Sequence, residues 1–275
     1  MRRLLVISAL LLCCVLPMRA QGSQGCLPQK AQNAFRGDEK LTLSLQYKWG
    51  AVNTDVATAV VQLDSVRFKG TPAYHCAFTV KSAPFFDLFF KMREDFQSWF
   101  TIDGLRPLKF SRNTSEGDYT ATNLYLYDWQ QKVIHADIRC GNNPAQSMDI
   151  PLHDCVYDLP TLIFYLRNAD FSKMKVGQSY PLSFAIDDAV FDIRLTYKGE
   201  ELMKARRLGK VKVRHFSCSV VSGAMFEGNQ ELQFWLSADE DALPVAVMAP
   251  LRVGAVWARL KAFENVKHGF TALQR

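Results

Sequence analysis

The stretch LTLSLQY, residues 41–47, decides the fold class of this chain because apolar and polar side chains alternate along it. Successive side chains of a β-strand point to opposite faces, so the alternation is typical of a strand with one buried and one wet face. The pattern recurs in the first half of the chain, in residues 56–68, 74–80, 96–102, 105–112, 119–127 and 132–139. Turn signals such as Asp103-Gly104 separate these segments and predict β-hairpins.

The alternation resumes after Val176-Gly177, in residues 179–186, 190–197, 211–221, 231–237, 243–248 and 253–263. Strands at this spacing favour an antiparallel sandwich or barrel, and a sheet with so many strands must curl or split. We therefore expect an all-β, mainly antiparallel fold. Its form would be a curved sheet or incomplete β-barrel of two strand sets, residues 38–140 and 176–275.

One segment between the two strand sets, residues 159–167, has helical periodicity instead. Its apolar residues recur at i, i+3, i+4 and i+7 and form one stripe: Leu159, Leu162, Ile163 and Leu166. Asp158 is a suitable N-cap, and Pro160 stands in the first turn, where a missing N–H costs nothing. The stripe has only sheet to pack against, so we expect the strands to wrap around one central α-helix.

The start of the chain has the order of a secretory signal peptide: Arg2-Arg3, an apolar run over residues 4–16, and the small residue Ala20. The run is too short to span a bilayer and no later segment is long enough, so we expect no transmembrane span. The pattern predicts cleavage after Ala20 and an exported, periplasmic protein. Residues 21–37, rich in Gln, Gly, Asn and Ala, predict a flexible lead-in to a single β-rich domain, residues 38–275.

Composition and charge exclude several classes of function. The 275 residues include 48% hydrophobic ones, enough for a sizeable core, and carry a formal net charge of +6. Three arginines of the signal contribute half of this charge, and the remainder is too small to favour a nucleic acid as partner. The Gly-x-Ser-x-Gly, phosphate-loop, dinucleotide and His-Glu-x-x-His patterns are missing. We therefore expect no cofactor and no metal, and the sequence argues against an enzyme without excluding one.

Five cysteines follow the signal, and an odd number leaves at least one thiol free or paired between chains. A disulfide between Cys140 and Cys155 would fix the approach to the helix with a gain of ~3 kcal/mol, although sequence alone leaves other pairings open. Cys155 beside His153 is also a candidate nucleophile, which the spacing disfavours because such neighbours meet only in a turn. Cys26 is disfavoured as a lipoprotein site because Ser23-Gln24-Gly25 fits a lipobox poorly.

The most apolar segment after the signal spans residues 84–92. Its four phenylalanines stand at i, i+1, i+4 and i+5, a spacing that fits a helical turn better than a strand: Phe85, Phe86, Phe89 and Phe90. The segment either covers the core or forms a lid or contact for a lipid or another apolar ligand. A helical turn buries one stripe and not its whole circumference, so we expect at least one of these rings to be exposed.

Three cations alternate with valines in the densest basic run of the chain: Lys210, Lys212 and Arg214. The alternation predicts that all three lie on one face of a strand. One interpretation is a solvated face that protects a sheet edge. The other is a site for an anion or a lipid headgroup.

Short motifs follow one another in a fixed order along almost the whole mature length. They are 37–41, Trp49-Gly50, Asp95-x-x-Ser98-x-Phe100, 103–107, Arg112, Glu116-Gly117-x-Tyr119, 157–159, 164–167, Val176-Gly177, Pro244-Val245 and Gly254. Together they resemble a family of exported bacterial proteins, the domain of unknown function 3108. Pro160-Thr161 departs from it, since members often carry Ser after the Asp-apolar pair. The resemblance implies a curved antiparallel sheet or incomplete barrel around a helix, similar to periplasmic lipoprotein-carrier and envelope-polysaccharide accessory proteins, and no established activity.

The sequence favours an exported envelope protein that binds an apolar or amphipathic ligand, or an envelope protein partner, without catalysis. The first alternative is a hydrolase or transferase acting on envelope glycan, which would use two carboxylates at a set separation. The second alternative is a structural interaction module. Two paired acids in a deep pocket would favour the glycan enzyme, whereas a wide apolar groove without perturbed acids would favour the binding protein.

Overall fold

The computed structural model describes residues 26–206, 208–220 and 231–274. The expected signal peptide and its cleavage site lie outside the described residues. Most of the described chain is strand, and the strands belong to one 16-stranded sheet.

The first eight strands form a meander in which each strand pairs antiparallel with the next along the chain. They are β1 (Lys40–Trp49), β2 (Val52–Phe68), β3 (Thr71–Ser82), β4 (Met92–Thr101), β5 (Pro107–Glu116), β6 (Tyr119–Asp128), β7 (Val133–Cys140) and β8 (Gln146–Pro151). In β1, Leu41 and Leu43 are buried as expected, but Ser44 and Gln46 are buried too. The face of β1 that was expected to be wet is therefore covered.

The second set completes the sheet. It consists of β9 (Val156–Tyr157), β10 (Ser179–Ile186), β11 (Ala189–Ala205), β12 (Gly209–Val220), β13 (Leu232–Ser237), β14 (Pro244–Pro250), β15 (Ala255–Glu264) and β16 (Leu273–Gln274). Pairing of β15 with β1 joins the two sets, and the path runs from β8 at one edge to β9 at the other. The described pairings are antiparallel except that of β9 with β10. The expected all-β, mainly antiparallel, curved open sheet is confirmed.

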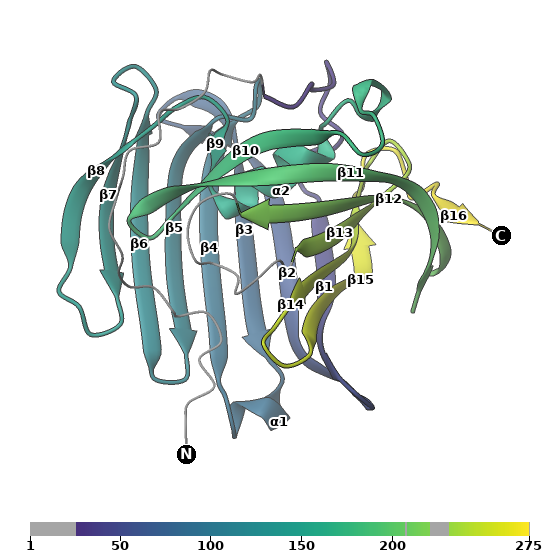
Figure 1. The fold of residues 1–275 in the computed structure, drawn as a ribbon. Coiled ribbons are helices and arrows are strands. Elements are labelled where there is room, and N and C mark those ends of the chain that lie inside the picture. The colour runs from purple at the N-terminus through teal and green to yellow at the C-terminus, as the bar shows by residue number, and fades with distance from the viewer. Residues whose placement is uncertain (1–25, 207, 221–230, 275) are drawn as a thin grey trace.

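The two edges of the sheet meet through side chains, since the ladder of paired strands ends at β8 and at β9. One apolar cluster holds Ile134 of β7 and Ile150 of β8 together with Val156 of β9 and Ala185 of β10. Figure 1 shows β10 and β11 lying across the strands of the first set. The sheet is therefore an incomplete barrel whose closure depends on packing.

Helix α2 (Leu159–Arg167) has the bounds that the sequence predicted, and it packs against β3, β4 and β10. Asp158 caps it, because its Oδ1 accepts the Thr161 N–H at 2.9 Å. The apolar stripe is only partly right: Leu162 is buried, but the other three of its members are half-buried. Phe164 and Tyr165 are buried as well, so the helix is packed on more than one side.

The segment expected to be a flexible lead-in is packed against the core over residues 26–37. Leu27 and Phe35 are buried, and the Phe35 ring contacts the Phe164 ring at a centroid distance of 4.8 Å. The Tyr165 hydroxyl donates to the Leu27 carbonyl at 3.1 Å. The expectation is wrong here because a few apolar anchors outweigh a polar average composition.

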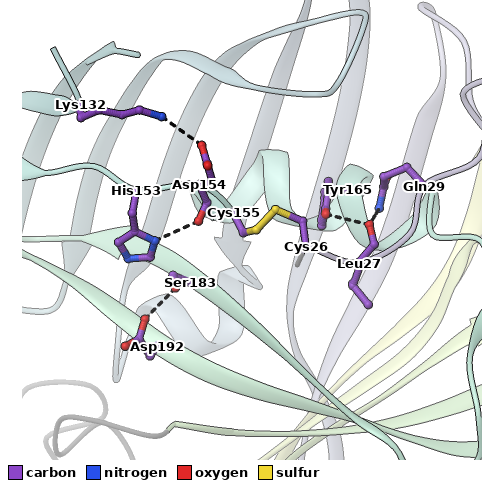
Figure 2. The surroundings of a disulfide bond; sticks show 10 residues. All are labelled: Cys26, Leu27, Gln29, Lys132, His153, Asp154, Cys155, Tyr165, Ser183 and Asp192. Carbon is purple, nitrogen blue, oxygen red and sulfur yellow. Dashed lines mark hydrogen bonds and ion pairs between the residues drawn. A yellow bond between two sulfur atoms is a disulfide. The ribbon is translucent and has the colours of Figure 1, made fainter. Parts of the chain in front are cut away.

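Cys155 forms a disulfide with Cys26, with the two Cα atoms 5.6 Å apart, and not with Cys140 (Figure 2). The expected Cys140–Cys155 bridge is wrong because β8 lies within the segment between them. Cys140 ends β7, and β8 carries the chain back along β7 before Cys155 is reached. The bridge also removes Cys155 as a candidate nucleophile, since a disulfide sulfur is not a thiolate. Figure 2 shows the neighbouring His153 hydrogen-bonded to the Asp154 carbonyl.

Candidate functional site

The connection between β3 and β4 forms a short apolar projection at one end of the sheet, at the bottom of Figure 1. It contains one helical turn, α1 (Pro84–Asp87), which Pro84 begins. Arg93 anchors this turn to β4 by donating to both carboxylate oxygens of Asp87, at 2.6 and 3.0 Å. Hydrogen bonds from Arg93 and then from Ser82 lower the pKa of Asp87 to about 2. The projection therefore has a fixed base.

Four large apolar side chains of this projection are exposed to solvent: Phe85, Leu88, Phe89 and Phe90. The exposed fraction is 65% for Phe85 and 75% for Phe89, whereas Phe86 is half-buried. The Phe85 ring contacts the rings of Phe86 and Phe89 edge-on, at centroid distances of 5.3 and 5.6 Å. The expectation of a helical turn with at least one exposed ring is confirmed. Residues 85–90 are named the aromatic segment.

Two acids, Glu94 on β4 and Glu116 on β5, lie at the base of the projection. Strand pairing places Glu94 opposite Thr114 and Met92 opposite Glu116. Gly117, the next residue, donates its N–H to the Lys91 carbonyl at 2.8 Å, which holds the β5–β6 turn against the end of the aromatic segment. The acid pair and the exposed rings therefore belong to the same end of the sheet.

Burial raises the pKa of both carboxyl groups. For Glu94 burial is the largest cause, and the Thr114 hydroxyl, which donates to Oε2, acts against it. For Glu116 burial and then the charge of Glu94 raise the pKa to about 7. Because like charges disfavour each other, ionisation of one carboxyl group opposes that of the other.

Arg112 is the buried cation beside this acid pair. Its Nε donates to Thr114 Oγ1 at 2.7 Å, and its Nη1 donates to Asp187 Oδ1 at 2.9 Å. Asp187 lies in the β10–β11 turn, and it also accepts from the Asn123 amide at 3.3 Å and, through its carbonyl, from Tyr125 at 2.6 Å. These contacts hold a turn of the second strand set on the inner face of the first.

The acid pair is a poor match to a glycan-cleaving site. Glycosidases need two carboxyl groups that flank the scissile bond and reach the substrate. Glu94 is buried, and its Oε2 accepts from the Thr114 hydroxyl. Burial therefore keeps one of the two carboxyl groups away from a polymeric substrate.

A depression of about 500 Å³ lies on the outer face of β6, β7 and β8. Its lining includes a hydrogen-bonded pair, His135 Nδ1 and Asp149 Oδ1, which are 2.7 Å apart. Ser147 is also in the lining, but it donates to Asp137 and not to His135. The group therefore lacks the contact between a hydroxyl and a histidine that nucleophilic catalysis requires.

The three cations of β12 lie along one strand, as the sequence predicted, but two of them have an ion-pair partner. Lys212 Nζ is 2.6 Å from Glu200 Oε2, and Arg214 Nε is 3.4 Å from Glu200 Oε1. Arg214 also donates to the Ser237 carbonyl at 3.0 Å. Glu200 therefore compensates the charge that an anion would need, and Lys210 is exposed beside this paired group.

A buried ion pair, for which no role was predicted, joins Arg167 of α2 to Glu39, next to β1. Arg167 Nη2 donates to Glu39 Oε2 at 2.9 Å, and the same nitrogen donates to the Asp241 carbonyl at 3.1 Å. The guanidinium also lies over the rings of Phe35 and Phe164, 5.4 and 5.3 Å from their centroids. A charged residue at the end of a mostly apolar helix was the available signal. The pair ties the helix to the sheet and not to a solvent-facing site.

A second buried polar group joins α2 to β4. Ser98 donates to Asp158 Oδ2 at 2.9 Å, and Thr161 lies 2.8 Å from the Ser98 hydroxyl. Burial raises the pKa of Asp158 to about 6 against the opposing effect of these hydrogen bonds. Ser98 and Asp158 both belong to the motifs that carry the resemblance, and their structural role is to position the helix.

Among the described residues, no helix has the length and apolar character needed to cross a membrane. The profile of a family described as "Protein of unknown function (DUF3108)" matches residues 44–261. No curated protein matches the chain.

Two solved structures match this chain to different degrees. One is a β-barrel-like protein of the domain of unknown function DUF1849 from Brucella abortus, with a TM-score of 0.59 and 8% identity, which covers 85% of this chain and 100% of its own. The other, from Parabacteroides distasonis, is provisionally assigned as a lipoprotein; its TM-score is 0.28 at 10% identity, with 88% of this chain and 100% of its own covered. The first similarity shows a shared β-barrel-like fold, and the second is too low to support an argument.

Proposed function

We propose, from the premise that this chain belongs to the DUF3108 family, that it is an exported envelope protein that binds an apolar or amphipathic ligand without catalysis. The family is one of unknown function, so membership indicates the fold and leaves the activity to the site. The observation that carries the proposal is the exposure of Phe85, Leu88 and Phe89 on a projection with a fixed base. Exposed apolar groups of this size are typical of a contact surface.

Export is supported by the N-terminal sequence and by the disulfide. Disulfides form and persist in oxidising compartments, which include the bacterial periplasm. The Cys26–Cys155 bridge is therefore consistent with a protein that leaves the cytosol. A sulfur in a disulfide is not available for the thioether bond of a lipoprotein, which supports export without a lipid anchor on Cys26.

The glycan enzyme is the weaker alternative. Of the two acids with raised pKa values, Glu94 is buried, and the outer depression holds a histidine without a hydroxyl in contact. A structural interaction module remains compatible with the same exposed rings. It differs from the binding protein in that no small apolar probe would bind.

The experiment compares apolar-dye binding by the wild type with that by a double variant, Phe85→Ser with Phe89→Ser. The variant should bind the dye at least about tenfold more weakly, because each substitution removes a ring whose apolar area a ligand would cover. Its melting temperature should stay nearly unchanged. Val176→Ser, which changes an exposed apolar residue elsewhere, is the matched control. Unchanged dye binding in the double variant would overturn the proposal.

A further inference from the structure

Three connections lie together at one end of the sheet. The β1–β2 turn follows Trp49, which pairs with Val52, and the β14–β15 turn is beside it because Lys48 of β1 pairs with Ala255 of β15. The β3–β4 connection follows Ser82, which pairs with Ala57 of β2. Figure 1 shows all three at the bottom of the view. Neighbouring strands thus bring distant parts of the sequence to one surface.

These connections carry most of the exposed large apolar side chains of the described residues. Of the eleven such side chains, seven lie there: Trp49, Val52, Phe85, Leu88, Phe89, Phe90 and Val253. None of the eleven lies in the β2–β3, β4–β5 or β6–β7 turns at the opposite end, within the described chain. The surface formed by the seven residues is named the apolar end.

Cations accompany the apolar end on the same connections. Lys48, Lys81, Lys91 and Arg252 are exposed, and none of them has an ion-pair partner within the described residues. Asp87 of the aromatic segment is already paired with Arg93. The exposed tips are therefore apolar, and most of the exposed charged residues around them are basic. The exceptions are Asp118 of the β5–β6 turn and Asp55 of β2, which is 3.5 Å from Arg206.

The width of the apolar end favours an extended apolar phase over a small ligand as its occupant. Strands β15, β1, β2, β3 and β4 are consecutive neighbours, so the outer tips are about 20 Å apart. A single small ligand does not span that distance. A protein partner would need a matching surface of about 800 Å², whereas separate tips enter a fluid bilayer without shape matching.

We propose that the apolar end is a membrane-docking surface, which inserts Trp49 and the exposed phenylalanines into the interface of an anionic bilayer. This inference rests on the proposed function and names the lipid bilayer as the apolar partner. Aromatic rings favour the interfacial region of a bilayer, and cations around them are attracted to anionic headgroups. The acyl region would cover the rings, and the headgroups would compensate Lys48, Lys81, Lys91 and Arg252.

Vesicle flotation of the exported protein tests the proposal, with vesicles of phosphatidylcholine alone and of phosphatidylcholine mixed with phosphatidylglycerol. We expect binding to the mixed vesicles. Phe85→Ser with Phe89→Ser, and separately Trp49→Ser, should each weaken it by about tenfold or more. Lys48→Gln with Lys91→Gln should weaken it by about fivefold for each charge removed. Lys69→Gln, in a turn at the opposite end, is the matched control and should bind as the wild type does.

The outcomes separate this inference from the proposed function. Dye binding that depends on Phe85 and Phe89, without vesicle binding, would overturn the membrane surface and leave the proposed function intact. Equal binding to both vesicle types, unaffected by the lysine variants, would overturn the anionic bilayer as partner. Self-association that the phenylalanine variant abolishes, without vesicle binding, would identify a second copy of the chain as the occupant and likewise overturn the inference.

Discussion

At the end of the sheet that holds the disulfide, the chain covers its own apolar side chains, whereas at the opposite end it leaves them in solvent. At the disulfide end, Phe35 and Phe164 pack against each other, and Leu105 of the β4–β5 turn is buried. At the apolar end, Trp49 and Phe89 are exposed on their turns. Both ends have aromatic residues, so composition alone does not separate them.

The two ends differ because only the disulfide end has chain segments that pack over its apolar side chains. Helix α2 and residues 26–37 pack over the inner side of β3 and β4 at the disulfide end, and the buried ion pair and the bridge hold them there. Apolar area removed from water stabilises the fold by about 25 cal/mol per Å². We therefore expect substitutions at the disulfide end to change stability and those at the apolar end to change binding.

The largest effect is expected at the buried ion pair of the disulfide end. Glu39→Ala would leave the Arg167 guanidinium buried without a carboxylate, which should lower the free energy of unfolding by about 3–5 kcal/mol. Urea unfolding measures the change. Replacing both partners, Glu39→Leu with Arg167→Met, should recover most of the loss because no buried charge remains. A loss below about 1 kcal/mol would be typical of an exposed pair and would contradict the structure.

The next effect separates the cysteines. Cys26→Ser should lower the free energy of unfolding by about 2–4 kcal/mol, because the bridge joins residues with a sequence separation of 129. Cys140→Ser removes a thiol that the structure leaves free, so its effect should stay within about 0.5 kcal/mol. Peptide mapping without reduction identifies the linked cysteines directly. A peptide that joins Cys140 to Cys155 would show that the bridge is misplaced.

An intermediate effect concerns pH at the base of the apolar end. The pKa of Glu116 is raised from 4.5 to about 7, so between these pH values the folded state holds a proton that the unfolded state has lost. Stability should therefore fall as the pH rises through this window. Glu116→Gln imitates the protonated form and should unfold at higher urea than the wild type at about pH 8, by on the order of 1 kcal/mol. A variant that is less stable there would mean that the ionised carboxylate is required.

The smallest effect is expected at the tip of the apolar end. Phe89→Ser should change the free energy of unfolding by less than about 0.5 kcal/mol, since most of the ring is already in solvent. Phe164→Ala, the matched change at the disulfide end, should cost about 3–5 kcal/mol. Thermal unfolding of both variants measures the contrast. Equal losses of unfolding free energy in the two variants would mean that the two rings are equally buried, which would contradict the structure.

Sequence patterns were reliable where a local period decided the outcome. Helix α2 begins and ends at the predicted residues, since Asp158 and the 3.6-residue period are local signals. Strand β10 also has its predicted bounds. The prediction failed where the outcome depended on chain direction in three dimensions. No strand was predicted at β8, which carries the chain away from Cys140 before Cys155 is reached.

The candidate site divides in the same way. Spacing predicted a helical turn within residues 85–90 with at least one exposed ring, because a helical turn buries one stripe and not its whole circumference. The position of the basic strand was predicted correctly. The ion pairing of its cations was not, because Glu200 reaches Lys212 and Arg214 from a neighbouring strand. The acid pair of Glu94 and Glu116 was missed, since the two residues become neighbours only through pairing of β4 with β5.

The sequence by itself determined the strand class, the position of the long helix and the apolar turn, because periods of two and 3.6 residues express backbone geometry directly. Only the tertiary structure decided that Arg167 meets Glu39, and that Trp49, Val253 and the aromatic segment share one end. The position of Val253 beside Trp49, for example, follows from the pairing of β15 with β1, which closes a separation of about 200 residues. No local period encodes such a pairing, because it depends on how the whole sheet curls to bury its apolar face.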